Sequence, residues 1–285
     1  MRKTSIIYFC ILLSISFSCT KSEVKEPEPV RLNRNANLLG AGSSANDILS
    51  NANFDTLQVE IGYVSGFRPT DASIIAFTDF LREYTFKENI EVTYLELPTP
   101  KKDKLTLQEV ADLEVKHRTA YNKDSSLAIY IYFSDAVSSE DDDDMGLVSL
   151  GAVYRNTSMV IYEATIRKLA SQSMAIAVTD VESATLNHEF GHLLGLVDLG
   201  SPAINDHEDE NAPNHCNADS CLMRAELQFN NNRRKTNVTN NLLDTPVCLL
   251  SGKTVLSLLS SKAAKNNALE LDSNCALDLQ MNGGR

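Results

Sequence analysis

Two histidines and a glutamate lie within the stretch "NHEFGHLLG" at residues 187–195. His188 and His192 are four residues apart, so on a helix both imidazoles project from one face toward a single point. Neutral imidazole is a good zinc ligand, and Glu189 can face the remaining coordination position. There it would take a proton from an activated water and pass it to a leaving amine. Ordinary amphipathic helices with two surface histidines can share this spacing.

The residue that would complete a three-ligand metal site is not fixed by this motif. Gly195 lies three residues after His192, where the helix must break sharply and a left-handed residue is useful. Beyond the glycine, three residues compete as the third ligand: Asp198, His207 and His215.

Together, "HEFGHLLG" and "HCNADSCLM" resemble the metzincin metalloproteases, and most closely the archaemetzincin pattern HExxHxxG, HC, four residues, C, one residue and M. The resemblance covers roughly residues 55–225. It implies zinc bound by His188, His192 and a third ligand, with Glu189 as the general base. Met223 would form the methionine turn beneath the metal.

The sequence departs from the family pattern at two positions. The family's third histidine would stand at Asp198, and the downstream CxxC is missing, so we do not expect the family's second, structural zinc ion. The resemblance also implies that a protein or peptide substrate binds in extended form along an edge strand near "GLVSLGAVYR", residues 146–155.

The N-terminus has the pattern of a targeting segment. Arg2 and Lys3 precede an apolar stretch that ends in "SFSC", with small residues around Cys19. This resembles a bacterial lipoprotein signal and predicts a signal peptide over 1–18, a lipidated Cys19 and a membrane anchor in the cell envelope. Cleavage of an ordinary signal peptide, which would give a secreted protein, is the alternative. Residues 19–52 are polar and aperiodic, which predicts a flexible tether.

Four cysteines remain beyond that segment, and an even number in an exported chain favours disulfides. Proximity in sequence pairs Cys216 with Cys221 and Cys248 with Cys275, although sequence alone cannot fix the pairing. A four-cysteine zinc site is the rival, but it lacks close CxxC pairs. The first pairing would hold His215 beside the methionine turn, so we favour His215 as the third metal ligand. Closing the longer loop costs little, because the penalty grows only logarithmically with length.

Strands and helices alternate before the motif. Residue patterns predict strands at 56–64, 90–97 and 127–135, helices over 70–86 and 105–121, and short strands within 146–155 and 158–164. Thr70 would cap the first helix, and Asp180 would cap a helix over 180–196 that carries the histidines.

This order predicts an α/β (α+β) fold with a twisted, mainly parallel sheet, two backing helices and an active-site helix. The catalytic domain would span 53–285. Its upper subdomain would cover 53–196, and a small irregular and helical lower subdomain would cover 197–285, with a helix near 251–265.

Composition and charge limit the classes of partner that the protein can bind. The formal net charge of −12 argues against nucleic acid, because phosphate binding needs a basic face. The run "EDDDD" at 140–144 could bind calcium through its oxygens, but no glycine-spaced ligand loop is present and charge runs are usually solvated. We expect a monomer.

These observations favour a zinc-dependent endopeptidase of the bacterial cell envelope. The alternative is a non-catalytic binding lipoprotein that keeps the metzincin scaffold, and the intact Glu189 argues against it. A purely structural zinc site is disfavoured, since such sites usually close with four protein ligands.

Overall fold

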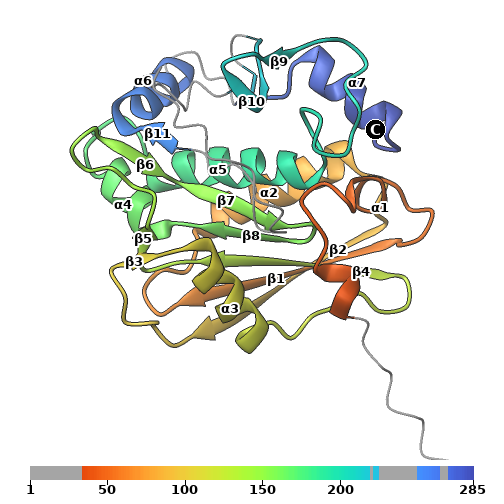
Figure 1. Cartoon of the computed structure of the whole chain (residues 1–285), viewed down its shortest axis with the longest axis horizontal. Coiled ribbons are helices and arrows are strands. Elements are labelled where there is room, and N and C mark those ends of the chain that lie inside the picture. Colours follow the sequence, from red (N-terminus) through yellow and green to blue (C-terminus); the bar gives the residue numbers. More distant parts are fainter. Residues whose placement is uncertain (1–33, 219–220, 225–248, 264–268) are drawn as a thin grey trace, which may run out of the picture. The chain divides into compact units, whose positions relative to one another are not determined.

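Five strands form the central sheet, in the order β2-β1-β4-β8-β7. Their bounds are β1 Thr56–Val64, β2 Asn89–Leu97, β4 Ser126–Phe133, β7 Gly151–Arg155 and β8 Ser158–Ile161. Strands β2, β1, β4 and β8 run parallel to one another. Strand β7 lies at the edge and is antiparallel to β8 (Figure 1). The predicted α/β fold with a mainly parallel sheet is confirmed, and the three long predicted strands coincide with β1, β2 and β4.

The computed structural model describes residues 34–218, 221–224, 249–263 and 269–285. These residues belong to one compact unit, Leu32–Arg285. The predicted signal peptide and the predicted lipidation site at Cys19 lie outside the described residues, as does Cys248. None of the described helices combines the length and apolar character needed to cross a bilayer.

Helices cover both faces of the sheet. Figure 1 shows α2 (Asp71–Tyr84) and α5 (Val178–Leu193) on one face and α3 (Leu107–His117) on the other. Strand β4 serves both faces because successive side chains alternate: Ile129 and Ile131 join the α2 and α5 core, whereas Tyr130 and Tyr132 join the α3 core. The α5 side is anchored by Phe190, whose ring packs edge-on against a phenylalanine of α2.

The helix boundaries follow their caps. Thr70 accepts a hydrogen bond from the Ser73 amide at 3.3 Å, as its predicted role as N-cap requires. The prediction for α5 was wrong in detail, because the helix already begins at Val178. Asp180 lies in the first turn and accepts a hydrogen bond from the amide of Ala177 at 2.8 Å.

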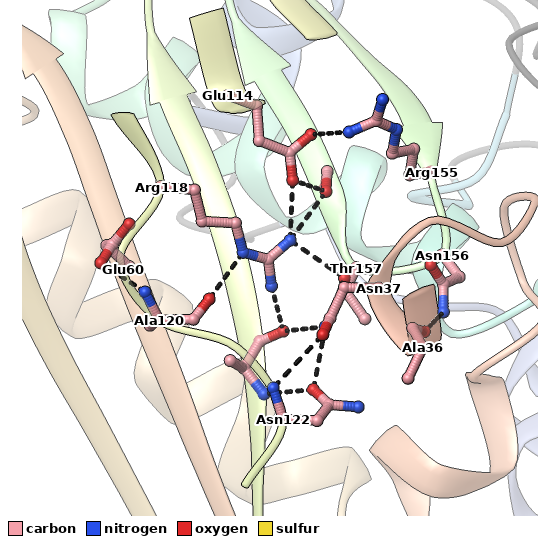
Figure 2. A network of polar contacts seen from close by, with 12 residues as sticks. Ala36, Asn37, Glu60, Glu114, Arg118, Ala120, Asn122, Arg155, Asn156 and Thr157 are labelled. Atoms are coloured by element: carbon pink, nitrogen blue, oxygen red, sulfur yellow. Dashed lines mark hydrogen bonds and ion pairs between the residues drawn. The ribbon is translucent and has the colours of Figure 1, made fainter. Parts of the chain in front are cut away.

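A buried polar network ties α3 to the sheet. Figure 2 shows Arg118, which is 5% exposed, at its centre. Its guanidinium donates to Glu114 Oε1 and to the Ala128 carbonyl, each at 2.7 Å. Glu114 also pairs with Arg155 at 2.8 Å, at the end of edge strand β7. Because each charge has a partner, the network fixes this edge strand without leaving a buried charge unpaired.

The predicted tether is wrong for residues 34–50. This segment forms the 3-10 helix η1 (Arg34–Asn37) and helix α1 (Ala45–Leu49), and Ile48 and Leu49 are fully buried in the core. The buried ammonium of Lys87 donates to the carbonyls of Asp47 and Ser50 and so holds α1 in place. Two apolar side chains in a single helical turn are too few to show a period in the sequence.

The shorter elements complete the fold. They are β3 Lys104–Leu105, β5 Val137–Ser138, β6 Leu147–Ser149, α4 Glu163–Ala170, β9 Glu208–Asp209, β10 Ala212–Cys216, β11 Leu249–Ser251, α6 Gly252–Ala263 and α7 Ser273–Met281. The predicted C-terminal helix is confirmed as α6, whereas α4 and α7 were not predicted. The amide of Arg285 donates to the Tyr84 carbonyl at 3.1 Å, so the chain after α7 returns to the end of α2.

Candidate metal centre

Helix α5 places His188 and His192 one turn apart against the body of the protein, where they are 2% and 4% exposed. Gly191 lies between them in the sequence. A Cβ at Gly191 would stand only 2.3 Å from the sulfur of Met223. The glycine is therefore what allows the buried methionine to pack directly against this turn of the helix.

His215 completes a cluster of three imidazoles. Its ring centroid lies 5.3 Å from that of His188 and 5.1 Å from that of His192, and the two helical rings are 4.9 Å apart. One ring nitrogen of each lies within 4.8 Å of the others, close enough for a single metal ion to contact all three.

The two rival candidates for the third ligand lie elsewhere. Asp198 is exposed and accepts a hydrogen bond from the Ala203 amide at 3.1 Å. His207 is buried beside Cys216 and Asp278. The structure thus brings His215, and neither competitor, to the helical pair.

Backbone carbonyls orient two of the rings. His188 Nδ1 lies 2.8 Å from the Leu222 carbonyl, and His215 Nδ1 lies 3.0 Å from the Pro213 carbonyl. A carbonyl oxygen only accepts, so each Nδ1 carries the proton and each Nε2 keeps its lone pair. Burial lowers the pKa of His188. For His192, burial and then the neighbouring histidines hold the pKa well below its usual value. Neutral rings with aligned lone pairs fit a zinc ion.

Glu189 is buried beside this cluster. Burial raises the pKa of its carboxyl to about 8, against a smaller lowering by a hydrogen bond from the Val153 backbone. Its Oε2 has no hydrogen-bond partner among the described residues. A Cβ at Gly151 would stand 2.7 Å from the Glu189 side chain, so edge strand β7 runs directly past the carboxyl. A carboxyl of near-neutral pKa in this position can exchange protons with groups bound beside it.

Helix α5 ends at Leu193, just before Gly195, where the sequence predicted a sharp break. Residue φ angles turn positive at Gly195 (79°), Val197 (54°) and Asp198 (63°). A Cβ at Gly195 would lie 2.5 Å from the Ser201 amide nitrogen, so glycine is needed there. The chain thereby leaves α5 and returns at His215 to complete the cluster.

A second group of donors lies next to the first. His207 Nδ1 is 3.4 Å from Cys216 Sγ and 3.9 Å from Cys275 Sγ, and Cys221 Sγ is 3.6 Å from Cys275 Sγ. Asp272, the N-cap of α7, also approaches Cys216 Sγ at 3.5 Å. We call His207, Cys216, Cys221 and Cys275 the thiol cluster.

The thiol cluster bears on two expectations. Cys216 and Cys221 are free thiols, so the predicted disulfide between them is wrong, and Cys275 is free as well. We did not expect a second metal ion, yet His207, Cys216, Asp272 and Cys275 form a second group that could hold one without a CxxC motif. Hydrogen bonds from Cys221 and Cys275 lower the pKa of Cys216.

The sequence reasoning missed the roles of His207 and Cys275. His207 looked like a solvated residue of the acidic stretch "NDHED", and Cys275 lies 54 residues beyond Cys221. The sequence signal that could have revealed Cys275 is that no other cysteine lies close to it in the chain.

The acidic run has a structural use. Asp141 accepts a hydrogen bond from the Ser149 amide at 2.7 Å, and Asp142 accepts one from the Met145 amide at 2.9 Å. These bonds close the turn before β6. Within the described ranges, neither group that could hold a metal ion includes residues 140–144, so nothing here supports calcium.

Comparison with known proteins gives little beyond this geometry. No family model matches the chain, and no curated protein matches it. Among solved structures, it is similar to archaemetzincin from Methanopyrus kandleri, with 13% identity and a TM-score of 0.43, over 81% of this chain and 96% of that one. At the site itself, helix α5 supplies two histidines and a buried carboxyl, and strand β10 supplies the third histidine.

Proposed function

We propose that this chain is a zinc-dependent peptidase whose metal is held by His188, His192 and His215. The observation that carries the proposal is the buried Glu189 carboxyl, adjacent in sequence to the first of three converging histidines. Three protein ligands leave a coordination position open, which distinguishes a catalytic site from a closed structural one.

The side chains divide the work as follows. His188, His192 and His215 would hold the zinc ion, which would act as a Lewis acid toward a carbonyl and a water. Glu189 accepts the proton of the attacking water and then returns it to the departing amine nitrogen. The hydrogen bond from the Val153 backbone holds the carboxyl beside the sheet edge while it does so.

The substrate in this proposal is an extended peptide paired with edge strand β7. Support comes from the sheet order, in which β7 is the last strand, and from its position against Glu189. Strand β6, which precedes β7 in the chain, is already paired antiparallel with β11 in a separate two-stranded sheet. The open stretch is therefore limited to β7, where a peptide could add as a further strand.

The thiol cluster would hold a second metal in a structural role. Its four donors come from β10, the turn after it, residues 199–213 (which we call the insertion) and α7, and four protein donors match the closed set of structural zinc sites.

The cellular part of the proposal rests on the sequence alone. We propose that Cys19 carries the lipid that anchors the protein in a bacterial envelope. Replacing Cys19 by Ala would then move the protein from the membrane fraction to the soluble fraction. A wild-type chain found entirely in the soluble fraction would contradict the anchor.

Metal analysis combined with a peptide-library cleavage assay tests the enzymatic proposal. We expect bound zinc, cleavage that stops with a chelator, and recovery when zinc is restored. A chain that binds zinc at the three histidines but cleaves no peptide in the library would favour the non-catalytic binding protein instead.

A further inference from the structure

Residues 215–218 and 221–223 link the two clusters. His215 is followed directly by Cys216, whose amide donates to the Met223 carbonyl at 2.8 Å. Cys221 is followed by Leu222, whose carbonyl orients the His188 ring at 2.8 Å. The position of one catalytic ligand and the orientation of another therefore depend on backbone next to cluster cysteines.

Regular secondary structure gives this segment little support. Strands β9 and β10 pair at only two positions, with an irregular register between them. Cys216 and Cys221 otherwise form isolated bridges with Arg224 and Glu270. Single backbone hydrogen bonds add to these bridges, as from the Asn217 amide to the His207 carbonyl and from the Leu222 amide to the Glu270 carbonyl, each at 2.8 Å. Because no continuous ladder holds the segment, side-chain contacts contribute strongly to where it lies.

His207 and Asp278 supply such contacts. Both are 1% exposed, and His207 Nε2 donates to Asp278 Oδ2 at 2.7 Å, which leaves Nδ1 facing Cys216 Sγ. A carboxylate that fixes the ring orientation in this way is the usual partner of a metal-binding histidine. Asp278 Oδ1 also accepts the Ile204 amide at 2.8 Å, so α7 holds both the imidazole and the insertion that carries it.

We propose that His207 and Asp278 are positioning residues for the three-histidine site, acting through an occupied thiol cluster. Metal in the cluster fixes residues 215–218 and 221–223, and only then do His215 and the Leu222 carbonyl take the places that the catalytic metal needs. This inference rests on the proposed function. It adds an order of metal binding, in which the thiol cluster binds its metal first and the three histidines bind theirs second.

Cobalt titration of the full chain tests the inference, because thiolate-to-cobalt absorption reports the thiol cluster and the imidazole site lacks it. The variants are His207→Ala and Asp278→Asn. We expect weaker thiolate bands in His207→Ala and cobalt affinity at the three histidines reduced by about 10- to 100-fold, with a smaller loss in Asp278→Asn. Asn205→Ala is the matched control, since it removes an exposed 3.0 Å hydrogen bond between the same insertion and α7. It should titrate like wild type.

The order of loading has its own test. His215→Ala should lose the second equivalent of cobalt and keep the thiolate bands. Wild-type affinity at the three histidines in His207→Ala or Asp278→Asn would overturn the inference and leave the proposed function intact. Asp278→Asn keeps all four cluster donors, so it decides the matter if His207→Ala does not fold. If His215→Ala bound as much cobalt as wild type, the proposed function itself would be contradicted.

Discussion

The two metal clusters are built from very different stretches of chain. The three-histidine site takes two ligands and its base from one helix, α5, which packs against α2, β7 and β8. The thiol cluster collects its donors from the insertion, strand β10, the turn after it and the C-terminal helix α7. The difference suggests a division of labour, in which a rigid scaffold carries the chemistry and the second cluster holds the part that has little scaffold.

The largest effect should come from the helix that carries the chemistry. Glu189→Gln keeps the size of the side chain but removes the base, so we expect cleavage to fall by about 10²- to 10⁴-fold with zinc content unchanged. Turnover and metal stoichiometry are measured on the same preparation. The exposed Glu91→Gln on β2 serves as the control. Loss of zinc together with activity in Glu189→Gln would assign the carboxyl a structural role.

Metal removal should separate the two regions. The thiol-cluster segments lie among short strands and isolated bridges, whereas β1 and β4 have continuous parallel pairing and the Arg118 network beside them. With a chelator, we expect amide hydrogen exchange to rise by orders of magnitude over residues 207–217 and 270–281, and little in β1 and β4. A similar rise in hydrogen exchange in β1 and β4 would show that the sheet also depends on metal. The proposed difference between the two regions would then be wrong.

The helical turn beneath the three-histidine site offers a sharper test. Gly191→Ala places a methyl group into the Met223 sulfur, which a Cβ would meet at 2.3 Å. We expect a loss of about 1–3 kcal/mol in unfolding free energy, the usual effect of overpacking, measured by urea denaturation. Gly40→Ala is the matched control, since its Cβ would meet nothing closer than 3.9 Å. A second change, Met223→Ala, should remove the clash and make Gly191→Ala nearly neutral in that background.

The difference between the two clusters also explains which features could be predicted from the sequence. His188 and His192 are separated by a fixed helical spacing, so the sequence alone placed them on one face, with Glu189 next to the first of them. β1 and α2 were also predicted closely, because alternation and a threonine N-cap are local signals.

The rest depended on distances that sequence does not encode. Proximity in the chain suggested a Cys216–Cys221 disulfide, yet in space both thiols meet Cys275 from α7. Lys87 holds the buried helix α1 by donating to carbonyls 33 to 40 residues away, and no local pattern indicates that partnership.

The smallest expected effect concerns how the stability of the fold depends on pH. It comes from Glu163, whose buried carboxyl lies near Glu182 of α5. Glu163 is fully buried at the start of α4, with Oε1 accepting from Arg167 Nε at 2.5 Å. Burial, then the nearby Glu182 of α5, raises the pKa of Glu163 from 4.5 to about 8. Between those values the unfolded chain binds fewer protons than the folded one, so stability is complete below the lower value and falls as pH rises toward the upper one.

Glu163→Gln mimics the protonated side chain, so it should flatten this part of the pH profile and make the variant more stable than wild type at the alkaline end. Urea denaturation across the window measures it, with the exposed Glu88→Gln as control. An unchanged slope in Glu163→Gln would mean that the proton is held elsewhere. The pH sensitivity of the scaffold would then have to be sought at Glu189, inside the site.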